Sequence, residues 1–233
     1  MTAKTSRTLG AAAAAVLLAA LGTAPAAAHT EESKAAKAAP AAKAPPPDLS
    51  GRTSAEIEQK QRGYFTDSEL VDQDGRKVRF YTDVLRGKLV VINFIYTDCG
   101  DACPLITHKL VQTRQQLGET FGRDVRFVSV SIDPQRDTPA ELKKFARKFD
   151  ADHPEWVFLT GDKPKVDLVL KKLGAYTDNV ESHFTGIIAG NLRADRWRKI
   201  RPDTPPNIIA DTVRYLAADP VASGAGPRVA PTR

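Results

Sequence analysis

The sequence predicts an α/β domain in which a central mixed sheet is flanked by helices, with an N-terminal β-hairpin extension. Two observations lead to this expectation. Near-continuous apolar runs at residues 88–96 and 125–132 are typical of strands that are buried on both faces. Each run is followed by a segment with helical spacing or a helix-start motif, and strand and helix signals then alternate along the chain.

Each further element has its own local signal. The Asp74-Gly75 pair, between two short runs of alternating polarity, predicts a β-hairpin. Thr138-Pro139 predicts a helix start in which Thr138 is the N-cap and Glu141 reaches back to it. The expected order is strands 69–72 and 77–80, strand 88–96, helix 104–117, strand 125–132, a helix from 139, strand 156–160, helix 163–173, strands 184–189 and 197–200, and helix 205–217.

The two ends of the chain are expected to lie outside the fold. Lys4 and Arg7 precede an Ala/Leu/Val run, and Ala26-Ala27-Ala28 is typical of a signal cleavage site. The run is short for a membrane span of about 20 residues, which favours cleavage over retention as an inner-membrane anchor. We therefore expect an export signal or anchor at 1–28, an Ala/Pro-rich disordered linker at 29–61, one folded domain at 62–217 and a disordered tail at 218–233.

Charge and cysteine content narrow the classes of function. The net charge is +6, with basic residues scattered among acidic ones, which favours solubility or an anionic membrane surface over nucleic-acid binding. In an exported or periplasmic protein, thiols are oxidised unless a reductant maintains them. Two cysteines are few for a disulfide-stapled domain, and a fold of this size can bury a core without them.

Those two residues, Cys99 and Cys103, follow the strand 88–96 and lie next to the expected start of a helix at Pro104. Functional groups gather at the carboxyl ends of strands, and Cys103 is expected at or next to the N-cap, where the helix dipole favours a thiolate. Three interpretations compete: a structural disulfide, a redox couple and a metal site. A disulfide would close a very small loop and stabilise little. The spacing is one residue wider than the C-x-x-C of thioredoxin-type couples, which favours a metal shared by both sulfurs.

The four histidines are the next candidate ligands. His29 would be the first residue after cleavage, and an N-terminal histidine can chelate copper, but it lies in the expected linker. His108 is expected to point away from the cysteines, and His153 stands in a polar turn where solvent exposure is the default. His183 stands at the start of an expected strand, where a structural role is the default because spacing alone says nothing about contact.

The folded segment carries several motifs in a defined order: C-x-x-x-C-P at 99–104, a strand followed by D-P-x-R-D-T-P at 129–139, W-x-x-L-T-G at 156–161, and then His183. In this order they resemble the motifs of the Sco/SenC family of copper-binding, thioredoxin-fold assembly proteins, with His183 in the place of the family's distant copper-binding histidine. Gly100 stands where many members have proline, and the aspartate that commonly precedes the family histidine is missing.

The resemblance implies a thioredoxin-like fold and a site for one Cu(I) or Cu(II) ion made by Cys99, Cys103 and His183. It further implies a role in delivering copper to, or reducing the cysteines of, the binuclear copper site in the copper-site subunit of a respiratory haem–copper oxidase. Of these two roles we favour delivery, by a metallochaperone rather than an enzyme. The alternative is a periplasmic thiol–disulfide oxidoreductase that uses Cys99 and Cys103 and is recycled by a thiol reductant. No proline occurs from Ala175 to Ile200, where such an oxidoreductase would place its cis-proline, and this favours metal handling.

Overall fold

The computed structural model describes residues 52–218. The expected export signal, most of the expected linker and all but the first residue of the expected tail lie outside these residues. The elements are, in order, α1 Ser54–Tyr64, β1 Glu69–Asp72, β2 Lys77–Arg79, the π-helical turn η1 Phe80–Leu85, β3 Leu89–Ile95, α2 Ala102–Leu117, α3 Thr120–Arg123, β4 Val125–Ser131, α4 Pro139–Lys148, β5 Trp156–Thr160, α5 Lys163–Leu173, the 3₁₀ turn η2 Val180–Ser182, β6 Ile187–Asn191, β7 Arg196–Ile200 and α6 Pro206–Ala217.

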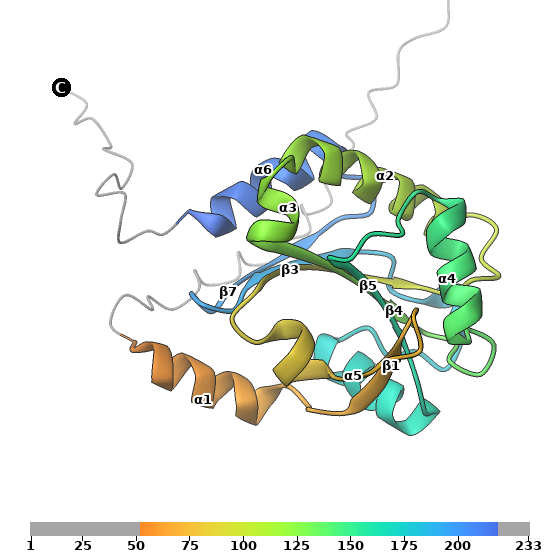
Figure 1. The fold of residues 1–233 in the computed structure, drawn as a ribbon, viewed down its shortest axis with the longest axis horizontal. Coiled ribbons are helices and arrows are strands. Elements are labelled where there is room, and N and C mark those ends of the chain that lie inside the picture. Colours follow the sequence, from red (N-terminus) through yellow and green to blue (C-terminus); the bar gives the residue numbers. More distant parts are fainter. Residues whose placement is uncertain (1–51, 219–233) are drawn as a thin grey trace, which may run out of the picture. The chain divides into compact units, whose positions relative to one another are not determined.

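The strands form one mixed sheet of seven, in the order β2-β1-β5-β4-β3-β6-β7. The three central strands β5, β4 and β3 run parallel, and β1 and β6 join them antiparallel on either side. Helices cover both faces of this sheet, with α2, α4 and α6 on one side and α1 and α5 on the other (Figure 1). The expected α/β fold with a central mixed sheet and an N-terminal hairpin is therefore confirmed.

Strand β3 shows why the apolar run at 88–96 is continuous. Successive side chains of a strand point to opposite faces of the sheet. Val91 and Ile95 pack into the core layer under α2, α4 and α6, whereas Ile92 and Phe94 pack into the layer under η1 and α5. Every residue of β3 is buried, so each position in the strand must be apolar or internally hydrogen-bonded.

The first helix lies partly in the segment that was expected to be linker. Thr53 caps α1, because its side chain accepts from the Glu56 N–H while the Glu56 carboxylate accepts from the Thr53 N–H, which forms a capping box. Ile57 and Gln61 are the two buried residues of this helix. The described fold thus includes residues 53–61, which the sequence placed in the linker, so the predicted domain boundary at residue 62 is too late. Because α1 has few apolar residues, hydrophobic periodicity in the sequence does not predict it.

Three other expectations need correction. Helix α2 begins at Ala102, two residues before Pro104, and β6 begins at Ile187 rather than at residue 184. Thr138 caps α4 as expected and accepts from the Glu141 N–H at 3.3 Å. The Glu141 carboxylate does not reach back to the cap; it lies 3.6 Å from Lys144 in an ion pair instead. Within residues 52–218, no helix has the length and apolar character needed to cross a membrane.

Candidate metal centre

Cys99 and Cys103 lie at the carboxyl end of β3, in the loop and first turn that lead into α2. The Cys99 N–H donates to the Tyr96 carbonyl at 3.2 Å, which turns the chain away from the strand. Cys103 is the second residue of α2, and its N–H donates to the Cys99 sulfur at 3.4 Å. The N-cap, Asp101, makes no side-chain capping bond, so the Cys99 sulfur takes the place of the usual cap acceptor. Both thiols are free.

The helix start favours a thiolate at Cys99, whereas the sequence led us to expect it at Cys103. Burial tends to raise the pKa of Cys99, but hydrogen bonds from the Cys103 and Asp101 N–H groups and from the Cys103 and Tyr96 side chains outweigh it and lower that pKa. Cys103 lies inside the first turn, where its side chain is 0% exposed, and burial raises its pKa to about 12. Cys99 is therefore the more acidic of the two thiols.

His183 lies beside the cysteines despite the 80 residues that separate it from Cys103. It follows η2, and its Nε2 is 3.8 Å from the Cys103 sulfur. Its Nδ1 is 2.8 Å from the Val180 carbonyl oxygen. A carbonyl can only accept, so Nδ1 carries the proton and Nε2 keeps a free lone pair toward the sulfur. Burial lowers the pKa of His183 and favours this neutral form.

The three expected ligands form a row rather than a closed cage. Cys99 contacts the backbone of Cys103, and the Cys103 sulfur contacts His183. Across the part of the chain that the structure describes, no group of three or more Cys, His, Asp or Glu side chains has converged enough to enclose a metal ion. The residues are thus adjacent, and an ion would have to draw their donor atoms together.

The two other histidines that the structure describes, His108 and His153, do not join this cluster. His108 is exposed on α2, as expected. His153 is half-buried rather than exposed, because its ring packs 4.8 Å from that of Phe121 and its Nδ1 accepts from the Glu155 N–H at 3.1 Å. Burial lowers the pKa of His153. His29 lies outside the described residues.

Tyr96 belongs to the centre, and sequence reasoning missed it. Its ring stands edge-on to that of His183, with centroids 5.6 Å apart. A hydrogen bond to Cys99 is the main reason that the pKa of Tyr96 is raised to about 12. Tyr96 therefore touches both ends of the row of ligands. The sequence did offer one clue to this role: Tyr96 is an aromatic residue with a hydroxyl group and stands at the end of a strand that is otherwise apolar.

Asp137 is the second residue that was missed. Its carboxylate is 1% exposed and accepts from the Thr97 N–H at 2.9 Å, the Thr97 hydroxyl at 2.6 Å and the Ser131 hydroxyl at 2.5 Å. In the D-P-x-R-D-T-P block the sequence predicted a structural role, helix capping, for Thr138 and Pro139 alone. The structure shows that the second aspartate of this block ties the loop before Cys99 to the end of β4.

Cys99 also lines a cleft of about 400 Å³ that opens beside α4. Its walls carry both charges, from Asp98 and Glu141 and from Arg136, Lys144 and Lys148, above the rings of Phe145 and Phe149. Cys103 and His183 are not among the lining residues. Of the three expected ligands, Cys99 is the one that faces this cleft.

The profile of the SCO1/SenC family matches residues 57–191, which include Cys99, Cys103 and His183. This chain belongs to the SCO1/SenC family. Among curated Sco proteins, the SCO2-like protein of Rickettsia conorii is 36% identical over 110 residues, which are 47% of this chain and 51% of that protein. The chain thus spans about half the length of the curated relatives it matches.

Solved Sco structures share the fold. ScoI of Bradyrhizobium japonicum, solved with copper bound, is 26% identical and aligns with a TM-score of 0.54 over 64% of this chain and 96% of ScoI. BsSco, described as a member of the Sco family of cytochrome c oxidase assembly proteins, is 25% identical with a TM-score of 0.54 over 66% of this chain and 94% of BsSco. These likenesses confirm the thioredoxin-like fold that the motifs implied.

Proposed function

We propose that this Sco-family chain binds one copper ion through Cys99, Cys103 and His183. The observation that carries the proposal is the 3.8 Å approach of His183 Nε2 to the Cys103 sulfur, with the lone pair of Nε2 kept free by the Nδ1–H bond to Val180. Two thiolates and one imidazole make a soft, low-coordinate donor set that suits Cu(I), whereas structural zinc takes a fourth ligand. The copper-bound structure of the related ScoI supports the same choice of metal.

Copper is the cargo in this proposal, and the receiver is the copper-site subunit of a respiratory haem–copper oxidase. The role of BsSco's family in cytochrome c oxidase assembly supports this partner. Cys99 faces the cleft beside α4, so a partner would meet this sulfur first. The motif at residues 1–28 supports export to the periplasm, with a cleaved signal or a retained membrane anchor. On this proposal the protein is a metallochaperone and not an enzyme.

A thiol–disulfide oxidoreductase is the second candidate, and the lowered pKa of Cys99 favours it. The Cys99 thiolate would attack a partner disulfide, which forms a mixed disulfide with Cys99 and releases the partner's first sulfur, which is then protonated to a thiol. Cys103 would then lose its proton and attack the Cys99 sulfur, which releases the partner's second sulfur as a thiol. The partner gains two electrons and two protons, and Cys99 and Cys103 become a disulfide that a periplasmic thiol reductant must reduce again. Copper binding needs the same pair reduced, so this step can prepare the site for the ion.

A Cu(I) titration of the reduced full-length chain against a competing chelator tests the copper site. We expect Cys99→Ser, Cys103→Ser and His183→Ala each to weaken binding by about tenfold or more. His108→Ala is the matched control and should bind as wild type does, because His108 is exposed on α2 away from the cluster. Equal affinity for wild type and His183→Ala would refute the three-ligand site. A wild type that ignores copper but reduces model disulfides would favour the oxidoreductase.

A further inference from the structure

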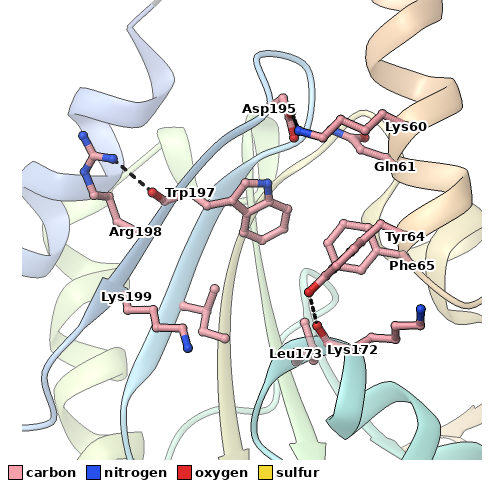
Figure 2. Close-up of a pocket in the computed structure, with 11 residues that line it drawn as sticks. Lys60, Gln61, Tyr64, Phe65, Lys172, Leu173, Asp195, Trp197, Arg198 and Lys199 are labelled. Carbon is pink, nitrogen blue, oxygen red and sulfur yellow. Dashed lines mark hydrogen bonds and ion pairs between the residues drawn. The ribbon is translucent and has the colours of Figure 1, made fainter. Parts of the chain in front are cut away.

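A second cleft, of about 340 Å³, lies between α1, the end of α5 and the β6–β7 pair (Figure 2). It shares no lining residue with the cleft at Cys99, and it includes none of the three proposed copper ligands. Its volume falls within the range of small-molecule sites, toward the lower end. The copper proposal does not account for this cleft.

The floor of the cleft is apolar and is formed by side chains from the sheet and from the ends of α1 and α5. Phe65 and Trp197 lie with ring centroids 5.4 Å apart, and Leu173 and Ile188 complete the surface. Trp197 pairs with Gly190 on β6, and a Cβ added to Gly190 would lie 2.2 Å from the indole ring. The glycine therefore lets the indole lie close against the neighbouring strand, which keeps the floor open.

The rim of the cleft is cationic. Asp195 is already paired with Lys60 at 2.5 Å and with Arg52 at 3.7 Å. In contrast, neither Lys172 nor Lys199 forms an ion pair with a carboxylate within residues 52–218; their ammonium groups lie 5.5 Å and 5.6 Å from the ring centroids of Tyr64 and Phe184.

The rim is also held in place at α5. The Tyr64 hydroxyl donates to the Lys172 carbonyl at 2.7 Å, which ties α1 to the end of α5 (Figure 2). Arg198 donates to the backbone carbonyl of Trp197, but its guanidinium is directed away from the cleft, 5.9 Å from the ring centroid of Tyr215 on α6 (Figure 2). An apolar floor thus stands beside two lysines, Lys172 and Lys199, that no acidic side chain of the described residues neutralises.

We propose that this cleft binds a small amphipathic organic anion. An aromatic ring or short acyl chain would lie against Phe65 and Trp197, and the rim lysines Lys172 and Lys199 would attract a carboxylate or phosphate. The floor disfavours an inorganic anion because such an ion leaves the apolar surface exposed to water. The rim disfavours a neutral or cationic ligand because the two lysine charges would remain without a counter-ion. The volume suits one ring system or one short chain rather than a whole phospholipid.

Calorimetric titration of the full chain with decanoate tests the site, with decyltrimethylammonium as the opposite-charge probe. We expect saturable 1:1 binding of decanoate and no binding of the cation. Lys172→Glu and Lys199→Glu should each weaken decanoate binding by about tenfold or more, as the loss of one charge-assisted hydrogen bond predicts. Lys171→Glu makes the same charge change on the same helix, outside the cleft, and should leave the affinity within about twofold.

The lysine changes lie at the rim, and circular dichroism should show that each variant keeps its fold. Equal affinity for decanoate and decyltrimethylammonium would overturn the proposal, since the cleft would then be merely apolar. Equal loss of decanoate binding in Lys171→Glu would overturn it as well, because the effect would be one of overall charge. Binding to phosphatidylglycerol vesicles without binding to free decanoate would also overturn it and indicate a membrane-facing surface.

Discussion

Asp137 ties the loop before Cys99 to the end of β4, and its removal should loosen the copper centre. Alanine at this position deletes the acceptor of three hydrogen bonds, from the Thr97 N–H, the Thr97 hydroxyl and the Ser131 hydroxyl. A buried donor without a partner costs about 1–3 kcal/mol, but both hydroxyls can rotate toward other acceptors. We therefore expect Asp137→Ala to lower the free energy of unfolding by about 2–4 kcal/mol, with the Thr97 N–H as the main loss.

Asp137→Asn keeps the shape of the side chain but removes its ability to ionise, so this variant shows the effect of the charge alone. Burial raises the pKa of Asp137 above its ordinary value of 3.8, although hydrogen bonds from Ser131 and Thr97 oppose the shift. A folded-state pKa above the unfolded one means that the protonated carboxyl stabilises the fold. This contribution is fully present below about pH 4 and is lost as the pH rises through the folded-state pKa. Because asparagine cannot ionise, the Asn variant should gain stability relative to wild type as the pH rises from about 4 to 7.

Thermal and urea unfolding at several pH values between 4 and 8 measure both effects. For a domain of this size, Asp137→Ala should lower Tm by roughly 5–15 °C. The same variant should also bind Cu(I) more weakly. Asp133→Ala is the control, because the Asp133 carboxylate pairs with exposed Arg136 at 3.0 Å and should contribute about 1 kcal/mol or less. Two results together would refute this role of Asp137 in holding the loop before Cys99: a stability difference between wild type and Asp137→Asn that does not change with pH, and little loss of stability in Asp137→Ala.

Three further predictions address other parts of the structure. At pH 7–8, iodoacetamide should alkylate Cys99 at least about tenfold faster than Cys103, because the first thiol has the lowered pKa and the second is buried with a pKa of about 12; mass spectrometry that finds Cys103 labelled first would contradict the assignment. Gly186→Ala should lower the free energy of unfolding by about 1–3 kcal/mol and weaken Cu(I) binding, because a Cβ there would lie 2.3 Å from the ring of Phe184, the residue after His183. An unchanged Tm and an unchanged Cu(I) affinity would count against this packing. Thr53→Ala should remove the cap of α1 and lower the free energy of unfolding in urea by about 1 kcal/mol. No change would mean that this capping box does not stabilise α1.

Local sequence patterns were sufficient to predict most strands of the sheet. Strand β5 and helix α5 occur at the bounds that the sequence predicted, and β3 and β4 differ from theirs by a residue at one or both ends. These elements are long apolar runs or bear clear start signals, so short-range periodicity and capping determine them. The same reasoning placed Cys99 and Cys103 at the carboxyl end of β3. It missed α1, because a surface helix with two buried residues has almost no periodic signal.

The chemistry of the centre depended on contacts that the sequence does not encode locally. His183 approaches Cys103 because β6 pairs with β3 in the sheet, which joins residues 80 positions apart; motif resemblance pointed to this histidine, but spacing could not. The more acidic thiol is Cys99 because α2 starts two residues earlier than Pro104 indicated, so that the helix N–H groups meet the other sulfur. The sequence alone thus determined the strands and the cysteine pair, through short-range periodicity. The tertiary structure decided which sulfur is activated, what holds its loop and where a second cleft lies, because each of these depends on side chains brought together from separate elements.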